Sequence, residues 1–333
     1  MDINVDQKAL KIRKQKEKEF DSKGTRTGLF SGFTFGLNSF FLALAFTLIP
    51  EELGKTIYVL PLVGAALNDT FAAIWLLIYN IAQGRGKEIK RSFKTFPGKM
   101  IALGALLGGP IAQGGYLLAI AFAGPAYAVP ISALCPAIGA LLSWIFLKEK
   151  ITPRVWGGLL LSVIGAIVIS YTPPTGDTYP NFYLGIIAAI VAAVGWGAEG
   201  VLGAFGSSVL DPKVAISIRD IVSGLAFMVV VVPIVKGFGA MKEILAMPKA
   251  VMYFAVAAAM AATSFLSWYK ANSTCGVAKG MALNSTYVAW GVILPIIFLG
   301  EKATTNLIIG SILVLLGAVL VSIDPKELFK KEA

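Results

Sequence analysis

Apolar stretches of about 20 residues recur along the whole chain, and they constrain its fold more than any other feature. A stretch of that length crosses the hydrocarbon core of a bilayer as an α-helix, which satisfies its own backbone hydrogen bonds where lipid offers no partner. Charged residues make up only 14% of the 333 residues, whereas an ordinary soluble domain carries about 25%. The sequence therefore predicts an all-α, multi-pass membrane protein.

Ten spans can be drawn between the polar segments. They cover about residues 27–49, 56–83, 99–123, 126–147, 153–171, 182–205, 212–235, 250–270, 278–299 and 304–323. Residues 1–26 form a charged arm that lacks the apolar core of a signal peptide. For this arm we expect a solvated, partly disordered tail, in preference to an amphipathic helix along the membrane surface.

The second half of the chain repeats the first at an offset of 152 residues. The repeat places Phe146-Leu147 on Phe298-Leu299, Glu149-Lys150 on Glu301-Lys302, Gly158 on Gly310 and Gly165-Ala166 on Gly317-Ala318. Such self-similarity decides the architecture before any other feature. Five spans per copy is an odd number, so the second copy would be inverted in the membrane, as in many secondary transporters. We predict repeats at 27–171 and 182–323, joined by a linker loop at 172–181.

Lysine and arginine fall mainly on one side of this predicted topology. The arm, the loop at 84–99 and the tail at 324–333 share that side, whereas the loop at 172–181 has no basic residue. Because cytoplasmic loops carry an excess of such residues, we expect cytoplasmic N- and C-termini in the cell (plasma) membrane. Topology then explains the net charge of +10, and no nucleic-acid partner is expected.

The residue types exclude several kinds of chemistry. Histidine is absent, and the only cysteines, Cys135 and Cys275, lie in or beside apolar runs. This removes His-based nucleophile pairs and His-ligated zinc, and there is no phosphate-binding loop for ATP. We expect no cofactor and no metal. A membrane-embedded enzyme and a non-transporting receptor or scaffold stay as alternatives, although the segment at 68–72 holds only the first aspartate of a prenyl transferase motif.

Ionisable residues inside spans are costly and are therefore functional candidates. The repeat aligns Asp69 with Asp220 once one residue is dropped. These two residues could brace their helices, with Arg219 neutralising one of them, and we favour this structural role over a role in transport. Glu199 has no basic neighbour in sequence, and a lone carboxylate in mid-membrane either faces water or carries a proton. Glu199, Asp69 and Asp220 are our candidates for proton or cation coupling.

The hairpin at the end of each fourth span resembles the drug/metabolite transporter superfamily, and within it the EamA-type members. The first copy reads Pro136, Phe146-Leu147-Lys148-Glu149-Lys150-Ile151-Thr152, Gly158 and Gly165-Ala166; the second reads Pro295, Phe298-Leu299-Gly300-Glu301-Lys302-Ala303-Thr304, Gly310 and Gly317-Ala318. The resemblance implies ten transmembrane helices as a 5+5 inverted-topology repeat around a central cavity. It also implies that Glu149 and Glu301 orient the hairpins by N-capping or salt bridges.

By position, the resemblance implies a set of polar and aromatic residues for substrate binding. They are Asn38, Gln113, Tyr116, Ser132, Trp196, Glu199, Trp268, Asn284, Tyr287 and Trp290. Nucleotide-sugar relatives carry G-A-L-N-K where this chain has Met281-Ala282-Leu283-Asn284-Ser285, and the missing lysine argues against such a substrate.

The predicted function is secondary active transport of a small polar metabolite, amino-acid-like or an organic cation, by alternating access. Coupling to a proton and exchange both fit the residues. The expected partners are the small-molecule substrate, the lipid bilayer and protons, and the protein would act as a monomer or homodimer.

Overall fold

The computed structural model describes residues 3–50, 53, 58–123, 131–132, 134–170, 181–299 and 305–322. Within these residues, helices long and apolar enough to cross a membrane are Ile12–Thr47, Val59–Ala82, Phe96–Ala119, Tyr183–Ser207, Pro212–Ile234 and Pro248–Cys275. Shorter apolar helices cover Cys135–Leu147 and Ile308–Val321. The chain is therefore a multi-pass helical membrane protein, as predicted. The turn at Glu301, the tail at 324–333 and nearly all of the linker at 172–181 lie outside the described residues.

The first half contains nine described elements. They are α1 (Ile3–Thr47), α2 (Val59–Ala82), α3 (Gly86–Ser92), α4 (Phe96–Leu106), the π-helical segment η2 (Leu107–Gln113), α5 (Gly114–Ala123), α7 (Cys135–Leu142), the π-helical segment η3 (Ser143–Leu147) and α8 (Pro153–Ser170). Helix α4 begins where Thr95 accepts a hydrogen bond from the Gly98 N–H, with proline in the first turn. Helices α4, η2 and α5 follow one another without a break and form a single crossing.

The second half has the same general plan. Its elements are α9 (Phe182–Ser207), α10 (Pro212–Ala226), the π-helical segment η4 (Phe227–Val231), α11 (Val232–Ile234), α12 (Phe238–Leu245), α13 (Pro248–Cys275), α14 (Val277–Asn284), α15 (Tyr287–Leu299) and α16 (Thr305–Ser322). Helix α7 begins at Cys135 and α15 at Tyr287, positions that differ by the repeat offset of 152. The two halves therefore start a helix at the same point of the repeat.

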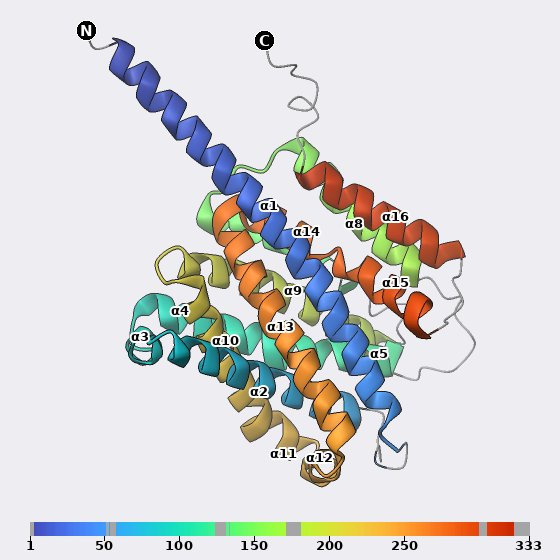
Figure 1. The fold of residues 1–333 in the computed structure, drawn as a ribbon. Helices are drawn as coiled ribbons and strands as arrows, with labels where there is room; N and C mark the ends of the chain where they lie inside the picture. Colours follow the sequence, from blue (N-terminus) through green and yellow to red (C-terminus); the bar gives the residue numbers. More distant parts are fainter. Residues whose placement is uncertain are drawn as a thin grey trace.

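The charged arm is part of α1 rather than a partly disordered tail, so that expectation was wrong. Figure 1 shows the arm as a straight continuation of α1 that projects beyond the bundle. Pairs one turn apart support the helix: Arg13 donates to Glu17 at 3.0 Å and Gln15 to Glu19 at 3.2 Å. Apolar periodicity does not reveal such a helix, because charged pairs and continuity with a spanning helix stabilise it.

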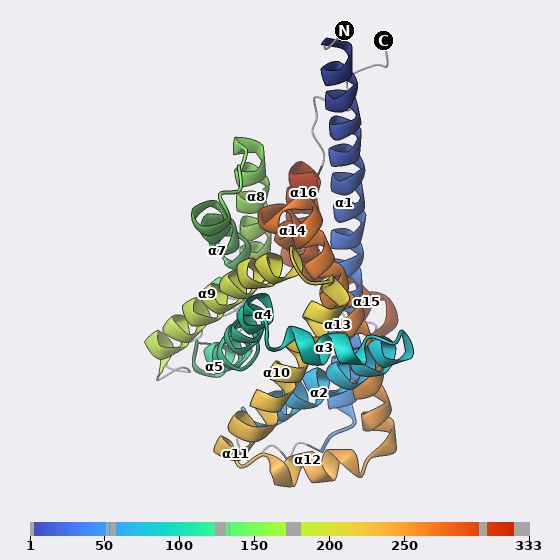
Figure 2. The same ribbon diagram turned by 90° about the vertical axis from the view of Figure 1, so that its left-hand side faces the viewer.

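Two long helix pairs organise the bundle. Helix α1 packs along α13, and α8 packs along α16 (Figures 1 and 2). Glycines let the second pair approach closely, because a Cβ on Gly165 would lie 2.7 Å from the carbonyl oxygen of Gly310 and one on Gly317 would lie 2.7 Å from that of Gly158.

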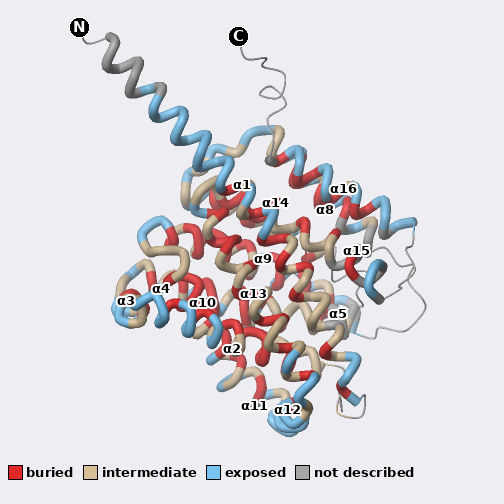
Figure 3. Tube along the Cα trace, viewed as in Figure 1, coloured by how far each residue is buried: buried red, intermediate tan, exposed pale blue. Residues whose placement is uncertain are grey.

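The interior of the bundle holds buried polar and charged side chains, whereas large apolar side chains cover the outside. Figure 3 shows buried segments along the inner faces of the helices and exposure on their outer faces and along the arm. Phe146, Leu160 and Ile187 are exposed, while Glu199 and Arg219 are buried. Lipid favours the first group outside, and the cost of placing charges in hydrocarbon keeps the second group inside.

Candidate functional site

A cavity of about 460 Å³ lies between the two halves. All of the predicted binding residues except Trp290 are in its lining: Asn38, Gln113, Tyr116, Ser132, Trp196, Glu199, Trp268, Asn284 and Tyr287. Of the additional coupling candidates, Asp69 lines the cavity and Asp220 lies behind it. That these residues bind a substrate stays a prediction.

Trp290 lies outside the cavity lining and packs against helix α1. Its ring meets that of Phe33 edge-on, with 5.0 Å between the ring centroids, and its Cβ lies directly over Gly36. The absence of a side chain at Gly36 therefore lets α15 approach α1 closely. The structure therefore does not bring Trp290 together with the other predicted binding residues, and its role in binding stays a prediction.

The cavity is located where regular helices are interrupted. Pro110 lies inside the π-helical segment η2. Proline has no N–H to continue the α-helical hydrogen bonds, which accounts for the interruption at this point. Across the cavity α14 ends at Asn284, and the amide of Asn284 donates to the Ser31 hydroxyl at 2.7 Å. Interrupted helices at membrane depth are typical of transporter binding sites, because they present backbone polar groups to a ligand.

Aromatic rings form much of the wall. Tyr116 and Trp196 have ring centroids 5.4 Å apart, and Phe35 and Tyr287 are 4.9 Å apart in an edge-on arrangement. The indole of Trp196 donates to the carbonyl oxygen of Gly108 at 3.0 Å, which fixes its ring. The indole nitrogen of Trp268 is buried and has no hydrogen-bond partner among the described residues.

A buried ionic cluster closes one side of the cavity. The guanidinium of Arg219 donates to Glu199 at 2.7 Å through Nε, and through Nη1 to Asp220 at 2.8 Å and to Asp69 at 3.3 Å. Its Cζ lies 4.3 Å from the centre of the Phe265 ring. The sequence neighbours of Glu199 indicated a lone carboxylate, but in the structure Glu199 pairs with Arg219. Arg219 also joins the two aspartates that the repeat aligns, so the expected neutralising role of Arg219 extends to three acids.

A polar chain connects this cluster to helices α1 and α13. Asp69 accepts a hydrogen bond from the Ser223 hydroxyl at 2.6 Å, and Asn68 next to it points its amide nitrogen at Asp69 from 3.4 Å. Asn38 donates to the Asn68 side-chain oxygen and to the Ala257 carbonyl oxygen, both at 2.8 Å. Because Asn38 occupies the oxygen of Asn68, the nitrogen of Asn68 must face Asp69.

Two consecutive glycines of η2 make room for the cluster. A Cβ on Gly108 would collide with the carboxylate of Glu199, and one on Gly109 would collide with the hydroxyl of Ser223. The backbone of the π-helical segment can therefore lie directly against both groups.

Comparison with known proteins agrees with these observations. The model of the EamA-like transporter family matches residues 27–171 and 183–323. The chain belongs to the EamA-like transporter family. Protein LicB from Haemophilus influenzae is 30% identical over 194 residues, which is 57% of this chain and 64% of LicB. The match thus spans less than two thirds of that relative. A crystal structure with 20% identity has a TM-score of 0.64 and covers 88% of this chain and 96% of its own, which shows a shared fold.

In this EamA-like protein the glutamate of the first hairpin links the two halves. Glu149 accepts hydrogen bonds from the N–H of Val277, at 3.2 Å through Oε1 and 3.1 Å through Oε2. It therefore caps the N-terminus of α14, a helix of the other half. N-capping was expected of Glu149, but its partner could not be read from the sequence. Asp21 of the arm and Lys279 of α14 form an ion pair of 2.6 Å at the same end, which we call the arm end.

Met281 of α14 lines the cavity and packs against two other helices. Its sulfur lies against Gly139 of α7 and Gly200 of α9, where any larger residue would collide with it. The thioether is 4% exposed and fills the space where three helices meet. These contacts join α14 to α7 and α9.

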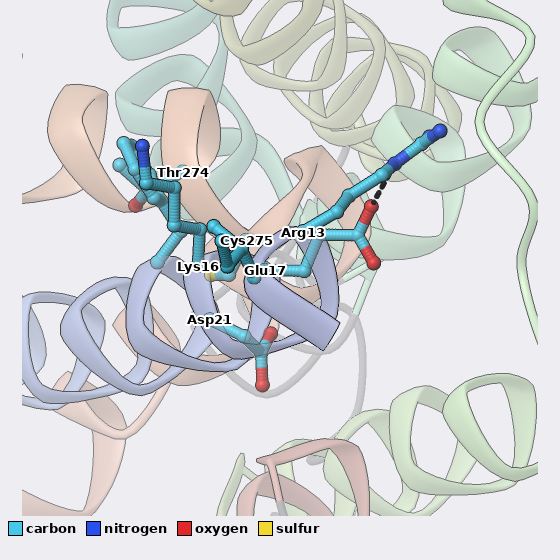
Figure 4. Close-up of a pocket in the computed structure, with 8 residues that line it drawn as sticks. Arg13, Lys16, Glu17, Asp21, Thr274 and Cys275 are labelled. Atoms are coloured by element: carbon cyan, nitrogen blue, oxygen red, sulfur yellow. Dashed lines mark hydrogen bonds and ion pairs between the residues drawn. The ribbon is translucent and has the colours of Figure 1, made fainter. Parts of the chain in front are cut away.

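An open groove of about 780 Å³ runs between the arm and the end of α13. Figure 4 shows Arg13, Glu17, Asp21 and Cys275 along it, with the Arg13–Glu17 pair at its rim. The groove is larger than the central cavity, but its walls are the solvent-exposed side of one helix and the end of another. It contains none of the predicted binding residues.

A partly buried ion pair holds two loops of this EamA-like protein together outside the spans. Arg85 and Asp211 are 2.6 Å apart. Partial burial is the largest single influence on Asp211 and opposes its ionisation. The hydrogen bonds from Arg85 and from the Lys213 N–H, together with the positive charges of these two residues, outweigh it and place the pKa of Asp211 below its usual range. Asp211 also accepts from the N–H of Lys213 at 2.8 Å and so caps α10.

Sequence reasoning missed Asn68, Ser223 and Ser31, which hold the predicted residues in place. Ser223 is four residues after Arg219 and so shares its helix face, and Asn68 adjoins Asp69. These two signals were available in the sequence. The contact of Ser31 with Asn284 had no such signal, because 253 residues separate them.

Proposed function

We propose that the protein is a secondary active transporter that carries a small organic cation through the central cavity by alternating access. The observation that carries this proposal is the charge of the ionic cluster. Asp69, Glu199 and Asp220 share the single guanidinium of Arg219, and no other basic side chain lines the cavity in the described part of the chain. With all three acids ionised the cluster carries an excess of negative charge, which favours a positive ligand or protons.

The walls of the cavity support the same class of substrate. Tyr116, Trp196 and Tyr287 line it together with Glu199, and aromatic faces attract cations by about 0.5–2 kcal/mol. The volume of about 460 Å³ lies within the range of roughly 300–1,000 Å³ of small-molecule sites.

An amino-acid-like substrate is the second candidate and is less favoured. Its ammonium group would suit the acids, but its carboxylate would need a positive partner. Arg219 is the cation available in the lining, and it already pairs with three carboxylates. The unpartnered indole N–H of Trp268 could donate to such a carboxylate, which keeps this candidate in the test below.

For topology we propose ten crossings in a 5+5 inverted repeat. The six long helices would supply six of these crossings. The remaining four would be α7 with η3, α8, α14 with α15, and α16. The matching starts of α7 and α15 support the repeat. Helix α1 begins and α16 finishes at the arm end, where Arg154 donates to the carbonyl oxygen of Leu320 at 2.7 Å. Two chain ends on the same side require an even number of crossings, as proposed. We propose that both termini are cytoplasmic and that the membrane is the plasma membrane. The working unit would be a monomer or a homodimer.

A thermal-shift screen on purified protein, followed by uptake into proteoliposomes, tests the function. Tetramethylammonium and small primary amines are the cationic probes, and neutral amino acids are the zwitterionic ones. A ligand at about 100 times its Kd stabilises the folded state by about 2.7 kcal/mol, so a cationic probe should raise the unfolding temperature and be taken up.

A pair of matched tryptophan variants controls for fold. Trp196→Phe lies in the cavity wall and should weaken the effect of the cation, whereas Trp290→Phe lies outside it and should not. Stabilisation and uptake of amino acids alone would refute the organic-cation proposal in favour of the second candidate. Absence of uptake for every probe would refute both.

A further inference from the structure

Helices α1 and α2 together supply a continuous strip of the cavity lining. Residues three or four positions apart share one face of a helix, and the lining residues of both helices recur at this spacing. They are Phe35, Asn38, Ser39, Leu42 and Phe46 on α1, and Pro61, Gly64, Ala65, Asn68 and Asp69 on α2. One face of each helix is therefore turned toward the cavity over more than two turns.

The strip changes from polar to apolar along both helices. At one end Asn38 of α1 donates to the side-chain oxygen of Asn68 of α2 at 2.8 Å, next to Asp69. At the other end the ring of Phe46 lies directly over Gly64, so that a Cβ on this glycine would collide with it. These two contacts show that α1 and α2 run in opposite directions, and the polarity therefore changes in the same direction in space on both.

The apolar end of the strip continues onto helix α5. Leu117 of α5 lines the cavity and packs against the same buried apolar cluster as Leu42, Phe46 and Ala65. We call this end the apolar compartment, and its described lining consists of Leu42, Phe46, Pro61, Gly64, Ala65 and Leu117. None of these side chains offers a hydrogen bond or a charge.

The interior of the protein backs the apolar compartment. Phe254 belongs to the buried cluster behind it, and the ring of Phe46 meets that of Phe254 edge-on with 5.6 Å between the ring centroids. Ser39, the polar residue one turn away on α1, donates its hydroxyl to the carbonyl oxygen of Phe35 in its own helix at 3.1 Å. The compartment therefore offers a bound ligand apolar contacts from fixed side chains.

The apolar compartment extends away from the ionic cluster. Ala65 and Pro61 precede Asp69 by four and eight residues on α2, which corresponds to about 6 and 12 Å along the helix axis. A ligand whose charge lies beside Asp69 can therefore place a second, apolar group between α1 and α2. A compact polar cation would leave this part of the cavity without a matching partner, because polar groups lose their hydrogen bonds with water against such a wall.

We propose that the substrate is an amphiphilic ammonium ion, with its charged nitrogen at the ionic cluster and an apolar tail in the apolar compartment. This inference rests on the proposed transport of an organic cation and narrows the substrate class. Burial of apolar surface drives the tail into the compartment, and each buried methylene tightens binding by about fourfold. A hydroxyl group on the tail would cancel that gain.

Equilibrium binding of n-alkylammonium ions to the purified full chain tests the apolar compartment without any transport. Ethyl-, butyl- and hexylammonium are compared through the concentration dependence of the unfolding temperature. The n-alkanols of the same lengths serve as uncharged probes. In the natural protein the Kd of the ammonium ions should fall by about fourfold per methylene.

Two matched variants of α2 isolate the apolar compartment from uptake of the probes by detergent. Ala65→Leu fills the compartment, so the gain per methylene should fall below about twofold. Ala73→Leu makes the same change eight residues further along α2, outside the described cavity lining, and should keep the full gain. Leu42→Ala enlarges the compartment from the α1 side and should increase the chain length at which the gain stops, which keeps the test decisive if Ala65→Leu does not fold.

The outcomes separate this inference from the proposed function. An equal gain per methylene in Ala65→Leu and Ala73→Leu would overturn the assignment of the tail, while binding of the ammonium ions would still support transport of an organic cation. If the alkanols bind with a gain that Ala65→Leu removes and no ammonium ion binds, the organic-cation proposal fails and the apolar compartment stands. Absence of binding in both series would overturn both.

Discussion

The Glu149 cap predicts a measurable change in the conformational equilibrium. Both carboxylate oxygens of Glu149 accept from the N–H of Val277, at 3.2 and 3.1 Å. Because Glu149 and α14 belong to different halves, we expect this contact to break when the halves separate at the arm end, so that it stabilises the closed state. Loss of a side-chain cap costs about 0.5–2 kcal/mol. In Glu149→Ala that loss falls on the closed state alone, and one or two kcal/mol changes a population ratio by about 5–30-fold.

A natural cysteine can report the change. Cys275 is the last residue of α13, two positions before the capped helix, and lies under Gly24 of the arm, where an added Cβ would be 2.9 Å from its sulfur. Cys135→Ser removes the other thiol, which lines the central cavity. In that background, the labelling rate of Cys275 by a membrane-impermeant maleimide should rise in Glu149→Ala, by at most about 30-fold.

Lys150→Gln is the matched control, since it changes the charge of the same hairpin without removing the cap. The two variants are compared at equal protein and maleimide concentration. If Glu149→Ala lowers the unfolding temperature but labels Cys275 no faster than Lys150→Gln does, the cap is only a local stabiliser and the reasoning fails.

Other predictions concern single contacts. Gly108→Ala should destabilise the fold by about 1–3 kcal/mol in thermal unfolding, because its Cβ meets the Glu199 carboxylate; Gly114→Ala, with no atom near its added Cβ, should be neutral. Asp211→Asn keeps the α10 cap but loses the Arg85 pair. The lowered pKa of Asp211 means that this stability is present above its unfolded pKa of about 4 and is lost as the pH falls through the lower folded pKa. At pH 7 the variant should therefore unfold at a lower temperature than the natural protein, with a loss of less than about 1 kcal/mol in the free energy of unfolding. In acid the two unfolding temperatures should converge, and a difference that persists there would contradict the assignment.

The sequence was sufficient for the fold class because length and apolarity alone decide which helices can cross a membrane. It was also sufficient for most of the cavity lining, because the family resemblance assigns each span a place. Pairing between spans was not accessible. Glu199 and Arg219 lie 20 residues apart, and Asp69 and Arg219 lie 150 apart, so the pairs depend on which helix faces turn toward each other. Trp290 shows the same limit, since its contact with Gly36 of α1 depends on how α15 approaches that helix.

The repeat extends the cap argument to Glu301, which falls on Glu149 at the offset of 152 residues. In an inverted repeat the second hairpin lies at the opposite end of the bundle. If Glu301 stabilises closure of that end, it stabilises the conformation in which the arm end is open. Removing it should then shift the equilibrium toward the closed arm end. Glu301→Ala should therefore slow the labelling of Cys275 in the Cys135→Ser background, where Glu149→Ala accelerates it.

The double variant distinguishes exchange between two caps from two unrelated local effects. If the caps stabilise alternative states of one equilibrium, their effects oppose each other, and Glu149→Ala with Glu301→Ala should return the labelling rate toward that of the background. Two independent local losses would instead leave the rate of the double variant equal to that of Glu149→Ala alone. Acceleration by both single variants would contradict the inverted use of the repeat, because each hairpin would then be stabilising the same closed state.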